Sequence, residues 1–160
     1  MRINYIPNDD FAKYLQALIV YNDGYSELLT TIRLNEAEVR RRRANGAVFM
    51  ISGTTQASTD PLSSVQRSMI GVMADGTIIF LAADAGKANP DTGQGHGDGL
   101  RIREGEDILR SMGAINVLNL DGGGSAQFWY DGRIRTYPGD LWEGRGVFRQ
   151  IGSVFLVFDR

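Results

Sequence analysis

Residues 115 to 125 read INVLNLDGGGS, an apolar run followed by an aspartate, three glycines and a serine. The apolar part, residues 115 to 120, predicts a buried strand. Three glycines in a row are costly because glycine loses more backbone entropy on folding than any other residue. They allow successive backbone N–H groups to converge on an anion, and Asp121 and Ser125 add a carboxylate and a hydroxyl at the edges. We interpret this loop as the active or binding site; the alternative is a flexible Gly/Ser turn.

The sequence around the loop differs from that of the common phosphate-binding loops. Neither GxxxxGK followed by Ser or Thr, nor GxGxxG, occurs in the chain. Residues 128 to 130, FWY, come just after the loop and favour a strand, whereas both motifs require a helix there. A dinucleotide-binding interpretation therefore lacks its structural context.

Hairpins and helices are predicted on both sides of the loop. A helix is expected at residues 102 to 112, ended by Gly113. Asp75-Gly76 and Asp131-Gly132 are typical of hairpin turns. The expected strands are residues 47 to 51, 69 to 73, 77 to 82, 115 to 120, 128 to 130, 133 to 137 and 154 to 158. This order predicts an α+β fold, a single compact domain in which helices pack on a largely antiparallel or mixed sheet.

The first 33 residues are expected to begin with a strand and a helix. Residues 1 to 5 alternate apolar and polar side chains, as in a short strand. Asp9 or Asp10 then caps a helix with one apolar face that ends near residues 22 to 24. Residues 25 to 33 fit either a strand or a helix.

A second helix is predicted at Glu36–Ala44. Asn35 and Glu38 resemble a capping box, and Asn45-Gly46 suits a left-handed C-terminal cap. Four arginines, residues 40 to 43, lie in its last turn and point around the helix rather than along one face. The helix dipole favours cations at this end, so we interpret the run as structural; a phosphate or nucleic-acid patch is the alternative.

Composition restricts the function by exclusion. The chain has 160 residues, no cysteine and one histidine, so a thiolate site, a cysteine nucleophile and a multi-histidine metal centre are ruled out. No metal and no cofactor is expected. A net charge of -2 gives no bulk attraction to nucleic acid, and no apolar run approaches the length of a membrane span or a signal peptide. We expect a cytoplasmic protein with a small-molecule partner, not a membrane or nucleic acid.

A glycine-rich loop is expected at residues 86 to 99, with glycines at alternate positions from Gly93 onward. Such a loop is mobile or becomes ordered by a ligand. It carries His96, the chain's only histidine, which is a candidate general acid; a solvated loop histidine is the alternative.

The motif NLDGGGSA at residues 119 to 126 resembles the signature of the phosphodiester glycosidase family. QRSMIG at residues 66 to 71 is similar to the family's arginine-led strand, and Asp75-Gly76 to its hairpin. SMGA at residues 111 to 114 and RQIG at residues 149 to 152 resemble the helix before the signature and the C-terminal arginine strand. The resemblance covers about residues 47 to 160, which leaves residues 1 to 46 as a short, divergent N-terminal part.

The resemblance implies hydrolysis of a sugar 1-phosphodiester at the glycosidic carbon. A phosphodiester is a good leaving group, so the site needs anion stabilisation more than a strong general acid. Asp121 is then the candidate nucleophile or general base, and Ser125 orients substrate or loop. Phosphate binding is assigned to side chains and backbone N–H groups of Arg67, Arg149, Gly122, Gly123 and Gly124, with Asp140, Ser52, Gly53 and His96 near the ligand.

Each of these side chains also has a purely structural interpretation. Asp121 can accept hydrogen bonds from the glycine loop, Arg67 can form an ion pair, and turn chemistry explains Asp140. Arg145 competes with Arg149 for the inward position.

Two features depart from the family pattern. Ser52-Gly53 stands where the family usually has Asn-Gly, unless Asn45-Gly46 fills that role; we prefer Ser52-Gly53 because Asn45-Gly46 is needed to end a helix. The N-terminal part is also short, so one wall of the cleft is missing or comes from another subunit of a homo-oligomer.

Two other functions are compatible with these departures. The first is a binding protein without turnover that sequesters a nucleotide or sugar-phosphate ligand. The second is an accessory domain of a larger viral or surface assembly, since a fold does not determine a function.

Overall fold

The computed structural model describes residues 16–29, 36–54, 64–85, 97–142, 145–151 and 155. Two α-helices, α2 (Glu36–Ala44) and α3 (Ile102–Ser111), and one 3-10 turn, η2 (Gly123–Ser125), occur in these residues. The strands are β1 (Gln16–Tyr21), β2 (Ser26–Leu29), β3 (Ala47–Gly53), β4 (Arg67–Met73), β5 (Ile78–Ala83), β6 (Ala114–Asn119), β7 (Trp129–Tyr130), β8 (Arg133–Ile134), β9 (Asp140–Trp142) and β10 (Arg145–Val147).

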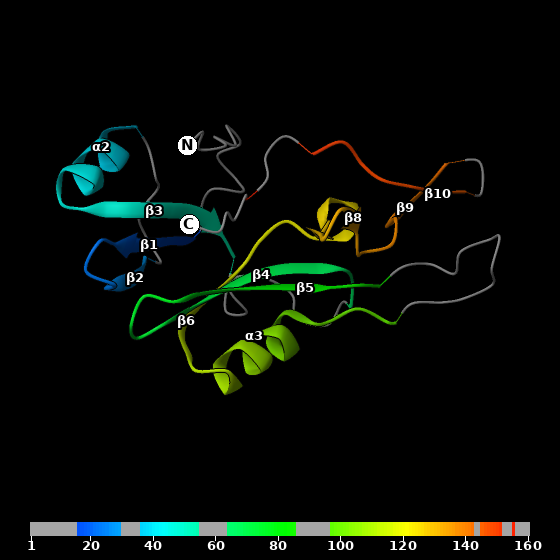
Figure 1. Cartoon of the computed structure of the whole chain (residues 1–160), viewed down its shortest axis with the longest axis horizontal. Helices are drawn as coiled ribbons and strands as arrows, with labels where there is room; N and C mark the ends of the chain where they lie inside the picture. Colours follow the sequence, from blue (N-terminus) through cyan, green and yellow to red (C-terminus); the bar gives the residue numbers. More distant parts are fainter. Residues whose placement is uncertain are drawn as a thin grey trace.

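Two three-stranded sheets form the centre of the fold. Their strand orders are β2-β1-β3 and β5-β4-β6, and every strand pair in the described residues is antiparallel. An isolated bridge between Thr54 and Asn119 joins the end of β3 to the end of β6. In Figure 1, α2 lies outside the first sheet and α3 outside the second, so the elements stack as helix, sheet, sheet and helix.

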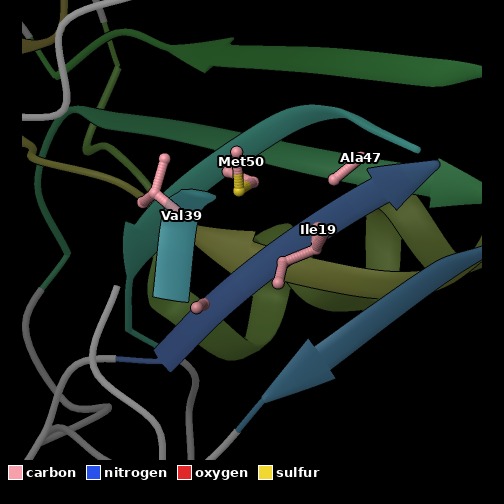
Figure 2. Packing of buried hydrophobic residues seen from close by; sticks show 5 residues of the cluster. Ile19, Val39, Ala47 and Met50 are labelled. Atoms are coloured by element: carbon pink, nitrogen blue, oxygen red, sulfur yellow. The ribbon is translucent and has the colours of Figure 1, made fainter. Parts of the chain in front are cut away.

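Three apolar clusters fill the spaces between these layers. The middle cluster joins the two sheets and contains Leu18, Val20, Ile70, Val72 and Leu118. The α2 cluster contains Ala17, Ile19, Val39, Ala47 and Met50 (Figure 2). The α3 cluster contains Met69, Ile102, Leu109, Ala114 and Val117. Alternate residues of β1 therefore enter different clusters, as expected for a strand that is buried on both faces.

The helix predicted before residues 22 to 24 is wrong where the structure describes it. Residues 16 to 21 form β1, which pairs with β2 on one side and β3 on the other. The β-branched Ile19 and Val20 and the aromatic Tyr21 favour a strand, and burial on both faces gives an unbroken apolar run instead of an alternating one. The open choice for residues 25 to 33 resolves as a strand at Ser26–Leu29. The strand expected at residues 1 to 5 lies outside the described residues.

Most other predicted elements are confirmed. The helix at Glu36–Ala44 has the predicted bounds, and α3 and β6 lie where they were expected. The Asp75-Gly76 turn joins β4 to β5, and the Asp131-Gly132 turn joins β7 to β8. The strand expected at residues 154 to 158 falls outside the described residues except for Phe155. The fold agrees with an α+β domain, although strands make up more of it than helices.

No helix within the described ranges has the length and apolar character needed to cross a membrane.

Candidate functional site

The glycine loop leaves the end of β6 and is anchored on the first residues of β4. The backbone N–H of Leu120 donates to the Ser68 carbonyl at 2.8 Å, and that of Gly123 donates to the Gln66 carbonyl at 2.9 Å. Asn119 reaches back to β3, where its Nδ2 donates to Thr54 Oγ1 at 2.9 Å. The loop is therefore a packed structure held at both ends, unlike a flexible Gly/Ser turn.

Close contacts explain why glycines occupy the loop. A Cβ atom at Gly122 would lie 2.7 Å from the Gln66 carbonyl oxygen, and one at Gly124 would lie 2.3 Å from Asp140 Oδ2. Gly123 has free space around it but a φ of 57°, a left-handed conformation that glycine adopts readily. The three glycines thus allow two close approaches and one backbone turn.

Arg149 and Asp140 form an ion pair against this loop. Arg149 Nε donates to Asp140 Oδ2 at 2.8 Å, and Arg149 Nη2 donates to Asp140 Oδ1 at 3.0 Å. These hydrogen bonds raise the pKa of the Arg149 guanidinium, and the negative charge of Asp121 adds to the same shift. Arg149 Nη1 also reaches Ser125 Oγ at 3.4 Å. A bidentate pair fixes the orientation of the guanidinium plane.

The backbone of Arg149 is tied to the loop as well. Gln127 Nε2 donates to the Arg149 carbonyl at 2.7 Å and to the Gly124 carbonyl at 3.2 Å. The structure therefore places Arg149 at the loop, as the sequence predicted. The Arg145 side chain, its competitor, lies outside the described part.

Asp121 stands exposed at the entrance of the loop. Its Oδ1 accepts the backbone N–H of Gly122 at 2.9 Å, which is the structural contact expected for this side chain. No other hydrogen bond of the Asp121 carboxylate occurs in the described part of the chain, so Oδ2 is available to solvent or a ligand.

Arg67 lies under the same loop, at the start of β4. Its side chain is buried, and its Nε donates to the Leu100 carbonyl at 3.0 Å. The position of a Cβ on Gly122 would be 3.7 Å from Arg67 Nη1. Burial lowers the pKa of the Arg67 guanidinium. A guanidinium beneath the loop can attract an anion, although the N–H groups of Gly122 and Gly123 already have acceptors in Asp121 Oδ1 and the Gln66 carbonyl.

Ser52 and Gly53 lie at the end of β3. Ser52 pairs with Ala17 of β1, and a Cβ at Gly53 would lie 2.3 Å from the Asn119 carbonyl oxygen. Gly53 therefore allows β3 to approach β6 two residues before Asp121. Asn45-Gly46 instead ends α2, with a φ of 89° at Gly46. His96 lies outside the described residues.

Gln66 is a buried contributor that sequence reasoning missed. Its Nε2 donates to Asp84 Oδ1 and to the Tyr137 carbonyl, both at 2.8 Å, and Asp84 Oδ2 accepts the Tyr137 N–H at 2.8 Å. Gln66 Oε1 is buried beside Gly139 and has no hydrogen-bond partner within the described ranges. Gln66 and Asp84 thus hold the segment that leads into Asp140. Gln66 is the first residue of the QRSMIG motif, but the motif does not indicate that this side chain supports the site.

The described residues bring Asp121, Ser125, Asp140, Arg149 and Arg67 to one loop from four parts of the chain. They contain no group of three or more His, Cys, Asp and Glu side chains that could hold a metal ion. The arrangement offers a carboxylate, a hydroxyl, two guanidinium groups and a turn of glycine backbone, which suits a phosphate-bearing ligand.

Comparison with known proteins identifies a family that the sequence matches. The sequence profile described as phosphodiester glycosidase matches residues 10–158, so it takes in residues before 47 as well. The N-acetylglucosamine-1-phosphodiester alpha-N-acetylglucosaminidases of Mus musculus and Homo sapiens are 36% and 34% identical over 98 residues. These alignments cover 58% of this chain and 17% of each relative, so the chain spans a small part of their length.

A solved structure shares the fold. The catalytic domain of zebrafish N-acetylglucosamine-1-phosphodiester alpha-N-acetylglucosaminidase, auto-inhibited by its pro-peptide, superposes with a TM-score of 0.62 at 20% identity. The match covers 86% of this chain and 50% of that chain.

Proposed function

The chain belongs to the phosphodiester glycosidase family, and we propose that it hydrolyses the glycosidic bond of a sugar 1-phosphodiester. The observation that carries the proposal is the meeting of Asp121, Ser125 and the Arg149–Asp140 pair on one glycine loop. The names of the mouse and human relatives suggest N-acetylglucosamine as the first sugar to test.

The reaction breaks the bond between the anomeric carbon and the ester oxygen. The leaving phosphate monoester takes the electron pair, so its negative charge is what the site must stabilise. Arg149 uses Nε and Nη2 for Asp140 and directs one N–H of Nη1 to Ser125, which leaves the second N–H of Nη1 for the phosphate. Arg67 supplies positive charge beneath it, whereas the N–H groups of Gly122 and Gly123, which the sequence assigned to the phosphate, are already donated to Asp121 Oδ1 and to the Gln66 carbonyl.

Asp121 acts at the anomeric carbon, on the side of the attacking group. As a general base it would take a proton from the water that attacks the anomeric carbon. As a nucleophile it would form a glycosyl ester that water then hydrolyses. Its exposed position and open Oδ2 are compatible with both roles. Ser125 orients the phosphate through the contact it already makes with Arg149.

The test uses purified protein and the methyl ester of N-acetylglucosamine 1-phosphate, with free sugar measured by mass spectrometry. We expect wild-type protein to release sugar and Asp121→Asn to lose at least about 100-fold in kcat/KM. Asn can still accept the Gly122 N–H, so folding and ligand binding should be retained. Asp107→Asn, an exposed carboxylate on α3, is the matched control and should remain active.

The alternatives give different results in the same assay. Ligand bound tightly and recovered intact would favour a sequestering protein. Neither binding nor turnover would favour an accessory domain. Hydrolysis that survives in Asp121→Asn would remove Asp121 from the reaction.

A further inference from the structure

A depression of about 420 Å³ lies beside the candidate site. Its walls include Arg133 and Arg135, the following Tyr137 and Pro138, and Phe148. This volume is in the range of small-molecule pockets. None of these residues takes part in the chemistry proposed above.

Two of the residues that line the depression are close in sequence to the Arg149–Asp140 pair. Pro138 is two residues before Asp140, and Phe148 directly precedes Arg149. Asp140 pairs with Val147 across β9 and β10, so both approaches run side by side. In Figure 1, β8 and β9 lie on the side of the β5-β4-β6 sheet that is opposite to α3. A ligand held at Arg149 therefore has the depression as its neighbour.

The charge of the lining is positive. Arg133 is exposed and has no hydrogen-bond or ion-pair partner among the described residues, and none of the described lining residues is acidic. Arg135 is held in place, since its Nε donates to the Tyr130 carbonyl at 3.1 Å and its guanidinium lies 5.7 Å from the Tyr130 ring centre. Arg135 Nη2 also donates to Asp131 Oδ2 at 3.4 Å, an ion pair with a highly exposed carboxylate.

Two aromatic rings complete the lining. Phe148 and Tyr137 keep 42% and 36% of their surface exposed, so part of each ring is accessible to a ligand. An exposed ring beside a guanidinium offers stacking to a flat ligand and attraction to its negative charge. A ligand with an aromatic ring and an anionic group can stack on these rings and be attracted by the arginines.

We propose that this depression is the subsite for the aglycone, the group esterified to the phosphate on the side away from the sugar. The inference rests on the proposed function. With the phosphate at Arg149, the sugar lies toward Asp121 and the aglycone extends between Phe148 and Arg133. The aglycone is of the nucleoside or aryl class and stacks on Phe148, while Arg133 and Arg135 add positive potential that attracts the phosphate carrying it.

Binding tests the subsite without turnover. The probes are adenosine 5′-monophosphate and ribose 5-phosphate, which differ by the base. We expect wild-type protein to bind the nucleotide about fivefold more tightly, because stacking on Phe148 contributes a factor of this size. Phe148→Ala should bring the ratio close to one, and Arg133→Gln should weaken both probes about equally. Ile108→Ala and Arg103→Gln, exposed side chains on α3, are the matched controls.

Turnover tests the same subsite on a substrate. The phenyl and methyl esters of N-acetylglucosamine 1-phosphate break the same type of bond but differ in leaving-group basicity, so the part of their kcat/KM ratio that depends on Phe148 reports aglycone recognition. We expect a severalfold preference for the phenyl ester that Phe148→Ala reduces.

The results separate the subsite from the hydrolase function. Nucleotide binding that depends on Phe148, without release of sugar, would support the subsite as a ligand site and overturn the hydrolase proposal. Sugar release with equal rates for both esters, or a nucleotide ratio unchanged in Phe148→Ala, would overturn the subsite.

Discussion

Arg149 donates two parallel hydrogen bonds to Asp140, from Nε to Oδ2 at 2.8 Å and from Nη2 to Oδ1 at 3.0 Å. The pair is half-exposed, with 50% and 33% of the two side chains accessible, so solvent screens its contribution to stability. Its geometric effect is larger, because two bonds fix the guanidinium plane and aim the remaining Nη1 at Ser125. The pair therefore contributes more to the orientation of the Arg149 guanidinium than to the stability of the fold.

Replacing Arg149 with lysine should separate orientation from charge. A lysine keeps the positive charge but cannot form the bidentate pair, so we expect kcat/KM for the sugar 1-phosphodiester to fall at least about tenfold. The Tm should change by only a few degrees because the pair is accessible to solvent. Steady-state kinetics and thermal unfolding check both parts. Arg103→Lys on α3 is the control; full activity in Arg149→Lys would contradict the orienting role.

Substituting Gly124 should disturb Asp140 through direct contact. A Cβ at Gly124 would lie 2.3 Å from Asp140 Oδ2, and the Arg149 pair prevents the carboxylate from moving away freely. We expect Gly124→Ala to lower the free energy of unfolding by roughly 1 to 3 kcal/mol and to reduce turnover. Denaturant unfolding and kinetics measure the two effects.

The control for this contact is the neighbouring glycine. No atom of the described residues lies within 4 Å of a Cβ at Gly123, and asparagine tolerates its positive φ, so Gly123→Asn should be milder. In the Asp140→Ala background, Gly124→Ala should cost less stability than in wild type, because the clash is gone. An equal cost in both backgrounds would show that the contact is not the cause.

The sequence analysis identified the glycine loop and charged residues at it, but not the residues that hold them in place. The loop, Arg67, Asp140 and Arg149 were identified because their motifs resemble those of one family, and the structure brings them together. Gln66 and Asp84 were missed, since their hydrogen bonds join residues 18 and 71 positions apart and leave no local pattern. Contacts of this kind depend on the packed fold rather than on neighbouring residues.

The N-terminal region shows a different source of error. An apolar face at helical spacing and an aspartate cap predicted a helix, but residues 16 to 21 form the central strand of a sheet. A strand buried on both faces has a continuous apolar run, which periodicity alone cannot separate from a buried helix. The β-branched Ile19 and Val20 were the better signal.

The arginine run on α2 gives the third prediction, because its members differ in their surroundings. Arg42 is 9% exposed, donates to Tyr21 OH at 2.7 Å and to Glu38 at 2.6 Å, and contacts Glu27. Arg40 pairs with Glu36 on the exposed face. The dipole argument favoured a structural role for the run, but only the partners on β1 and β2 determine which arginine turns inward.

Arg42→Leu should therefore destabilise the protein by roughly 3 kcal/mol, because it leaves the partly buried Glu27 carboxylate without its cation. Arg40→Leu changes the same residue type two positions earlier and should alter Tm within experimental error, since both partners are exposed. Thermal and urea unfolding of the two variants measure the difference. Equal stability would mean that the Arg42 network contributes no more than a surface pair, and that the contacts between α2 and the first sheet depend on the apolar cluster around Val39 alone.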